Sequence, residues 1–137
     1  MKMNPYLVFK GNAREAFQFY EKILDGKIEA IMTFGEAPGM EVYTPPGWKD
    51  KVMHTWMTFD GNVLMASDAA PEQFEAMQGM SVALHPETVE DAERQFKALS
   101  EGAKIIMALQ ETFWAKRYGM LVDRFGTPWM INCSPMP

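Results

Sequence analysis

An internal repeat constrains the fold of this chain more than any single residue, because the second half follows the same pattern as the first. Residues 8–26 and 84–102 each run from an apolar segment through a helical pattern to a glycine over the same number of positions. Residues 61–65 and 126–130 each consist of a glycine, three further residues and a methionine. Repeats of this length are typical of two copies of one supersecondary unit that share a core.

Each half predicts one strand, one helix and three further strands. In the first half we expect strands at residues 6–9, 27–34, 52–59 and 63–67 and a helix at residues 13–24. In the second half we expect strands at residues 81–84, 104–109, 119–122 and 129–133, with the helix between Thr88 and Gly102. The sequence therefore predicts an α+β fold with two βαβββ modules, about residues 3–68 and 79–134 of a single domain 1–137. Together these modules are expected to form a half-open barrel with a ligand cup inside.

The ends of the two predicted helices carry residues that commonly cap helices. Asn12 is expected to accept a hydrogen bond at the start of the first helix, and Gly26 to end it in a left-handed conformation. Thr88, with Asp91 three residues later, forms an approximate capping box at the start of the second helix.

The first module is longer than the second. Gly26 and Gly61 are 35 residues apart, whereas Gly102 and Gly126 are 24 apart, so the first module carries 11 additional residues. Residues 35–51 are rich in proline and glycine, and we expect the insertion there, as a long excursion between two strands.

The strand predicted at residues 52–59 has apolar or aromatic side chains on both faces. Alternation places Met53, Thr55, Met57 and Phe59 on one face, and His54, Trp56 and Thr58 on the other. One helix can cover only one face of a four-stranded sheet. We therefore expect the second face to be covered by other groups or to line a cavity.

Composition excludes several classes of function. The net charge is −5, with 47% hydrophobic residues, which gives no basic surface for nucleic acid. No segment is apolar enough over sufficient length to span a membrane. A single cysteine, Cys133, excludes an internal disulfide and fits the reducing cytoplasm, where we expect this protein.

Several segments carry a family resemblance. They are residues 4–7 (NPYL), 11–16 (GNAREA), 19–20 (FY), 52–54 (VMH), 64–68 (LMASD), 112–119 (TFWAKRYG) and 123–129 (DRFGTPW). With the βαβββ repeat, they resemble PhnB-like proteins of the vicinal oxygen chelate superfamily, a group also labelled 3-demethylubiquinone-9 3-methyltransferase-like. That superfamily includes glyoxalase I, bleomycin- and fosfomycin-resistance proteins and extradiol dioxygenases. The resemblance covers the whole chain and implies a cytoplasmic homodimer.

The resemblance also indicates where metal ligands would lie. Metal-dependent members place His or Glu on the first and last strands of each module, which here correspond to Pro5, Ser81, Met65 and Met130. A neutral thioether is a poor ligand for Zn, Mn or Fe, and a shift of one or two positions offers only Asn4, Ser67 and Asn132. We therefore expect no metal site and no other cofactor.

His54 is the candidate catalytic residue, because an imidazole can act as a general base or as a hydrogen-bond donor. The alternative is a strand histidine that bonds a backbone carbonyl. Ser67 is a candidate ligand-binding residue at the mouth of the cup, and its alternative role is to end the strand together with Asp68.

Aromatic residues and one cation complete the candidate ligand site. Trp114 could stack on a planar ligand while Arg117, in the loop before the closing hairpin, holds an anionic group. Alternatively, these aromatics pack beneath the final hairpin. Trp56 and Trp129 are candidates to line the cup, or else pack in the core or a dimer interface.

These patterns favour a protein that binds a small apolar or aromatic molecule without a metal. One alternative is a metal-free isomerase or lyase with His54 as base. Another is a metal-dependent enzyme of glyoxalase or dioxygenase type, if the metal ligands lie in a different register. The sequence has no G-x-G-x-x-G motif, so a doubly wound methyl-donor fold is not expected.

Overall fold

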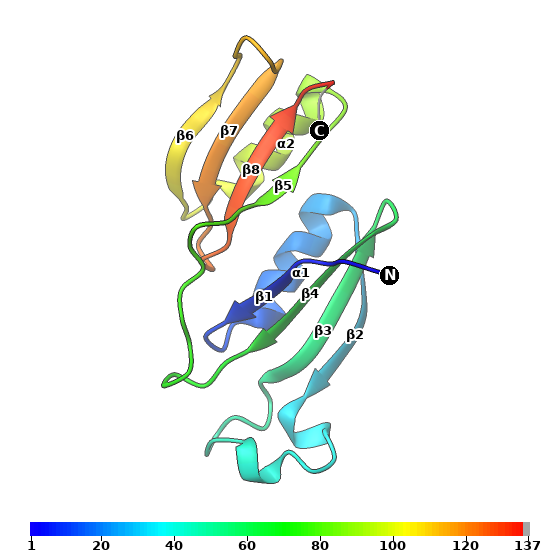
Figure 1. Cartoon of the computed structure of the whole chain (residues 1–137), viewed down its shortest axis with the longest axis vertical. Helices are drawn as coiled ribbons and strands as arrows, with labels where there is room; N and C mark the ends of the chain where they lie inside the picture. The colour runs from blue at the N-terminus through cyan, green and yellow to red at the C-terminus, as the bar shows by residue number, and fades with distance from the viewer. Residues whose placement is uncertain (136–137) are drawn as a thin grey trace. The chain divides into compact units, whose positions relative to one another are not determined.

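The computed structural model describes residues 1–135 and consists of two compact units, of which the first is Met1–Ala76 and the second begins at Met77. The first contains β1 (Tyr6–Phe9), α1 (Ala13–Leu24), β2 (Lys27–Thr33), the 3-10 helices η1 (Phe34–Glu36) and η2 (Glu41–Tyr43), β3 (Val52–Phe59) and β4 (Asn62–Asp68). The second contains β5 (Val82–Leu84), α2 (Val89–Leu99), β6 (Lys104–Gln110), β7 (Arg117–Val122) and β8 (Pro128–Cys133). The α+β prediction of two βαβββ modules is confirmed (Figure 1).

Both modules have the same sheet topology. The strand orders are β1-β4-β3-β2 and β5-β8-β7-β6, with the first strand parallel to the last and the other pairs antiparallel. Each sheet is open at both edges and has one helix on one face (Figure 1). The opposite face of each sheet, which we call its helix-free face, is the surface on which a module can present functional side chains.

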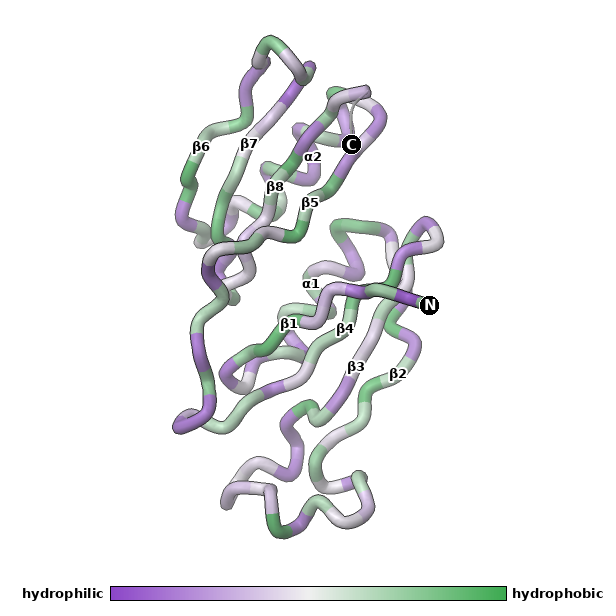
Figure 2. The backbone as a smooth tube through the Cα atoms, viewed as in Figure 1, coloured by the Kyte–Doolittle hydropathy of each residue, from purple (hydrophilic) through white to green (hydrophobic). Residues whose placement is uncertain are grey.

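Side-chain alternation determines which residues form the core of the first module. Leu7 and Phe9 of β1 are buried toward α1, together with Met57 of β3 and Leu64 of β4. The buried face of α1 comprises Ala13, Ala16, Phe17, Tyr20 and Ile23, spaced by three and four residues as on one helical face. In Figure 2, β1 and β4 carry mostly hydrophobic colour, as expected for strands whose alternate residues fill this core.

The start of α1 differs from the prediction. Asn12 makes no side-chain capping bond, and its Oδ1 is buried with no hydrogen-bond partner within residues 1–135. The backbone N–H of Ala13 instead donates to Oδ1 of Asp68, at 3.0 Å. A buried carboxylate from the end of β4 thus replaces the local cap. At α2 the prediction is confirmed, because Thr88 accepts a hydrogen bond from Asp91 N.

The end of α1 also differs. Asp25 adopts the left-handed conformation, at φ 51°, while Gly26 has no positive φ. Gly26 is instead required by close packing, because a Cβ atom there would lie 2.6 Å from Met57 Cε and 3.0 Å from Thr58 O. In the second module Gly102 has φ +70°, in the left-handed region that favours glycine.

Two loop predictions can also be compared with the structure. Residues 35–51 do form a long excursion, whose base is fixed by hydrogen bonds from Phe34 N to Lys51 O and from Gly35 N to Lys49 O. The loop before the closing hairpin is shorter than predicted, because β7 begins at Arg117 and pairs this residue with Cys133. None of the helices within residues 1–135 has the length and apolar composition needed to cross a lipid bilayer.

Candidate functional site

Three aromatic side chains gather on the helix-free face of the first sheet, and we call Tyr6, His54 and Trp56 the aromatic cluster. The rings of Tyr6 and His54 stack, with centroids 5.7 Å apart and planes 17° apart. Trp56 lies two residues after His54 in β3, and its ring centroid is 5.6 Å from that of the His54 ring, with the planes tilted by 32°. These contacts form a continuous aromatic surface that carries two polar groups, the Tyr6 hydroxyl and the His54 imidazole.

Strand register explains why these residues meet. Met65 of β4 pairs with Tyr6 of β1 on one side and with Trp56 of β3 on the other. The side chains of Tyr6, Met65 and Trp56 therefore form a row across the face, and His54 lies next to this row, two residues before Trp56. Ser67, two residues farther along β4, pairs with Val8. His54 and Trp56 share this face because they alternate with the buried Thr55, as the sequence predicted.

A hydrogen bond orients the imidazole. Tyr6 Oη lies 3.1 Å from His54 Nδ1. If the hydroxyl donates to Nδ1, the neutral imidazole carries its proton on Nε2 and can donate to a ligand there. If Nδ1–H donates to the hydroxyl oxygen, Nε2 becomes a free acceptor. In both arrangements the Tyr6 contact leaves Nε2 as the nitrogen that can meet a ligand.

The candidate residues of the second module occupy different positions. Trp129 is 1% exposed on the helix-covered face, and its Nε1 donates to Asp123 Oδ2 at 2.8 Å, so it occupies the core position that the sequence left as its alternative. Arg117 is on that same face, and its Nε donates to Glu93 Oε1 of α2 at 3.3 Å. This guanidinium is therefore engaged with a carboxylate and packs at the helix.

Trp114 lies in a small aromatic group at the start of β7. Its ring packs edge-on against Phe113 at 4.9 Å and against Tyr118 at 5.1 Å. Its carbonyl accepts a hydrogen bond from Ser134 Oγ, which ties the loop to the segment after β8. Packing near the final hairpin was the alternative for Trp114, and these contacts place it there, while Arg117 is paired with Glu93.

Sequence reasoning missed Tyr6. A usable signal was present, because Leu7 and Phe9 alternate with Tyr6 and Val8 in a short strand. Assigning Leu7 and Phe9 to the core would have placed Tyr6 on the helix-free face. Its contact with His54 depends on β4 lying between β1 and β3, which the sequence pattern does not specify.

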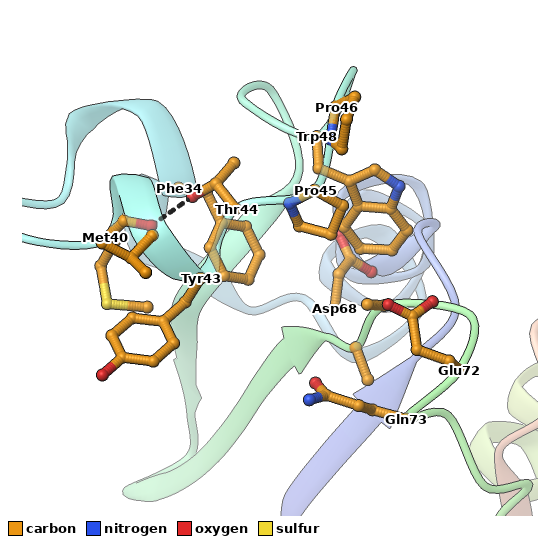
Figure 3. Close-up of a pocket in the computed structure, with 13 residues that line it drawn as sticks. Phe34, Met40, Tyr43, Thr44, Pro45, Pro46, Trp48, Asp68, Glu72 and Gln73 are labelled. Atoms are coloured by element: carbon orange, nitrogen blue, oxygen red, sulfur yellow. Dashed lines mark hydrogen bonds between the residues drawn. The ribbon is translucent and has the colours of Figure 1, made fainter.

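The first unit also contains a pocket of about 650 Å³, shown in Figure 3. One wall comes from the excursion, including Phe34, Tyr43 and Trp48, and the other from Asp68 and the segment that follows β4. The aromatic cluster does not line it. The sequence predicted the insertion but not that it would form a pocket wall.

The positions that hold metal in chelating relatives do not fit a metal here. Met65 and Met130 lie on the helix-free faces of β4 and β8 and offer only thioether sulfur. Pro5, at the first-strand position, contributes a carbonyl oxygen that already accepts a hydrogen bond from Met65 N. Residues 1–135 contain no group of three or more His, Cys, Asp or Glu side chains arranged to hold a metal ion.

Several known proteins are similar to this chain over almost its whole length. YjdN of Escherichia coli is 35% identical over 139 residues, which cover 96% of this chain and 95% of YjdN. The crystal structure of PA1353 from Pseudomonas aeruginosa is 44% identical, with a TM-score of 0.89 and 98% of each chain covered. The PhnB protein of Bacillus cereus is 27% identical, with a TM-score of 0.82, and covers 98% of this chain and 100% of its own.

More distant structures share the fold alone. The fosfomycin resistance protein FosX of Listeria monocytogenes has a TM-score of 0.65 at 10% identity, with 99% of this chain and 94% of FosX covered. The sequence profile of the family described as 3-demethylubiquinone-9 3-methyltransferase matches residues 1–132. This chain therefore belongs to that family, whose PhnB-like members have the fold of the vicinal oxygen chelate superfamily.

Proposed function

We propose that this protein binds a small apolar or aromatic molecule against the helix-free face of its first sheet. The aromatic cluster carries the proposal, because two stacked rings and an adjacent indole provide a preformed surface for a planar ligand. Met65 lies in the same row and supplies an adaptable apolar contact. Nε2 of His54 adds one polar group that can fix the orientation of the ligand.

The name of the family does not extend this proposal to methyl transfer. A doubly wound parallel sheet with a glycine-rich first turn is the common site for a methyl donor. Both sheets within residues 1–135 are mixed, with one helix each, and no glycine-rich motif follows β1. Sequestration or sensing of an organic compound accords better with the side chains present.

A titration with 1-naphthol tests the proposal. We expect a saturable shift of the Trp56 indole signal in NMR spectra, and at least fivefold weaker binding by Trp56→Leu. Trp48→Leu is the matched control, because Trp48 lines the separate pocket and its loss should leave 1-naphthol binding unchanged. Equal weakening by both substitutions, or no saturable shift, would refute binding at the aromatic cluster.

A metal-free isomerase or lyase is a second candidate, favoured by the Tyr6–His54 hydrogen bond. Such a bond holds an imidazole in position for proton abstraction next to a carbonyl. Acetophenone in D₂O provides a probe, because exchange of its methyl protons reports base catalysis. We expect the protein to accelerate this exchange and His54→Gln to abolish the acceleration. If the wild-type protein has no effect, the enzymatic candidate is rejected while binding of 1-naphthol remains an independent result.

A further inference from the structure

The excursion forms one wall of a pocket in the first module, and the corresponding connection in the second module is much shorter. Eighteen residues separate β2 from β3, whereas six separate β6 from β7. The additional residues place Phe34, Tyr43 and Trp48 on one wall of the pocket of about 650 Å³ (Figure 3). This volume is within the range of about 300–1,000 Å³ that is usual for sites of small molecules.

The backbone holds both walls in place. On the excursion side, Trp48 N donates to Pro45 O and Phe34 packs edge-on against Trp48, with centroids 6.4 Å apart. On the opposite side, Ala69 N donates to Phe9 O at 2.8 Å and Gln73 N to Ala70 O at 2.8 Å. Because both walls are already bonded, a ligand would meet a largely preformed site.

The charges that line the pocket are all negative. Asp68 is 4% exposed, and its carboxylate accepts hydrogen bonds from Gly11 N, Ala13 N and Val52 N. Glu72 is exposed and has no ion pair within residues 1–135. The lining contains no lysine or arginine. The nearby Lys51 lies outside the lining, with its Nζ bonded to Gly11 O at 2.9 Å.

We propose that this pocket binds a small organic cation, such as a quaternary ammonium compound. Aromatic faces attract cations through the negative charge density of their rings, and the attraction is largest for tryptophan. Trp48, Phe34 and Tyr43 provide such faces, while Glu72 provides a carboxylate at the rim. Asp68 adds negative charge without offering a free oxygen, because its hydrogen bonds hold the fold.

Choline and its neutral isostere 3,3-dimethylbutan-1-ol form a pair of probes that differ chiefly in charge. We expect choline to shift the Trp48 indole signal saturably in NMR titrations, with a dissociation constant about fivefold lower than that of the isostere. The Trp48 signal is assigned by its loss in Trp48→Leu. Equal affinity for the two probes, or tighter binding of the isostere, would overturn the proposal.

Substitutions at two neighbouring carboxylates locate the site. Glu72→Gln should weaken choline binding about threefold and leave binding of 3,3-dimethylbutan-1-ol unchanged. Glu75→Gln makes the same charge change three residues farther along, at an exposed residue outside the lining, and should have no effect. Trp56→Leu should also leave choline binding intact, which separates this pocket from the aromatic cluster. Equal effects of Glu72→Gln and Glu75→Gln would show only a general charge effect and refute the site.

Discussion

In the first module, the carboxylate of Asp68 bonds backbone N–H groups up to 57 residues away in the chain, whereas the carboxylate of Asp123 in the second module accepts three hydrogen bonds from the turn and strand that follow it. Asp68 joins the segment before α1 to the start of β3. Asp123 accepts hydrogen bonds from Phe125 N, Thr127 N and the Trp129 indole. The same topology is therefore stabilised by a long-range anchor in one copy and by a local anchor in the other.

The helix-free faces differ in a second way. The first sheet presents the aromatic cluster, whereas the second sheet pairs Met107, Met120 and Met130 by register, with Tyr118 at the start of β7. Methionine adapts to many shapes, but aromatic rings in fixed contact favour a planar ligand. The repeated topology thus provides two sheets, and the side chains on one face of each sheet decide which is suited to ligand chemistry.

Removing the long-range anchor should have the largest effect. Asp68→Ala leaves three backbone donors without their acceptor, two of them buried, and each buried donor costs about 1–3 kcal/mol. We expect the free energy of unfolding in urea to fall by about 4 kcal/mol. Amide exchange should accelerate at Gly11, Ala13 and Val52 together.

Asp123→Ala is the matched change in the second module. These three donors lie within six residues of the carboxylate and two of them are buried, so we expect a similar cost of about 4 kcal/mol, with the effects on amide exchange centred on residues 125–129. If the exchange effects of Asp68→Ala stay confined to β4, or if those of Asp123→Ala reach α2, the distinction between long-range and local anchors fails.

Close packing of two glycines offers the next comparison. A Cβ atom at Gly119 would lie 2.8 Å from Phe96 Cε2 and 3.0 Å from Leu109 Cα, in the neighbouring strand. Gly119→Ala must therefore displace backbone, and we expect the free energy of unfolding to fall by about 3 kcal/mol.

Gly26→Ala should cost less, about 2 kcal/mol, because its shortest contact is with the end of the Met57 side chain and its one backbone contact, with Thr58 O, is at 3.0 Å. Thermal unfolding of both variants measures the difference. A larger loss for Gly26→Ala than for Gly119→Ala would contradict this account of the two contacts.

Most of the fold was predictable because strands and helices leave periodic patterns in sequence. The helix at residues 13–24 and the strand at residues 52–59 were predicted with the bounds that the structure has. The errors lie at element ends, and at the start of α1 a distant group replaces the local cap. Asn12 has the right residue type for a cap, but Asp68 accepts the bond because the topology brings the end of β4 to the start of α1.

The candidate site was less predictable than the fold. His54 and Trp56 were assigned to one face by alternation, and the structure places both there in contact. Tyr6 was missed because its partner lies 48 residues away, across an intervening strand. Arg117 and Trp129 were chosen by residue type, but strand phase directs both side chains to the helix-covered face. Residue type suggests chemistry, whereas phase and register decide which groups meet.

The starts of the two helices provide a smaller test. Thr88→Ala removes the hydrogen bond from Asp91 N and should lower the free energy of unfolding by about 1 kcal/mol. Asn12→Ala should change it by less than about 0.5 kcal/mol, because the Asn12 side chain makes no capping bond and its Oδ1 is buried without a partner within residues 1–135. Urea denaturation distinguishes the two. If Asn12→Ala lowered the free energy of unfolding as much as Thr88→Ala does, Asn12 would act as a local cap of α1 after all.

A small effect on stability is also expected from the hydroxyl group that orients His54. Tyr6→Phe keeps the stacked ring but removes the hydrogen bond to Nδ1, and this bond is exposed, so the free energy of unfolding should change by less than about 1 kcal/mol. Long-range ¹H–¹⁵N spectra of the imidazole should nevertheless show a redistribution of its proton between Nδ1 and Nε2.

Tyr118→Phe is the control in the second module, since the Tyr118 hydroxyl makes no hydrogen bond within residues 1–135. If Tyr6→Phe leaves the imidazole signals as unchanged as Tyr118→Phe does, the Tyr6 hydroxyl does not set the orientation of His54, and the first module loses the feature that favours it as the site of proton transfer.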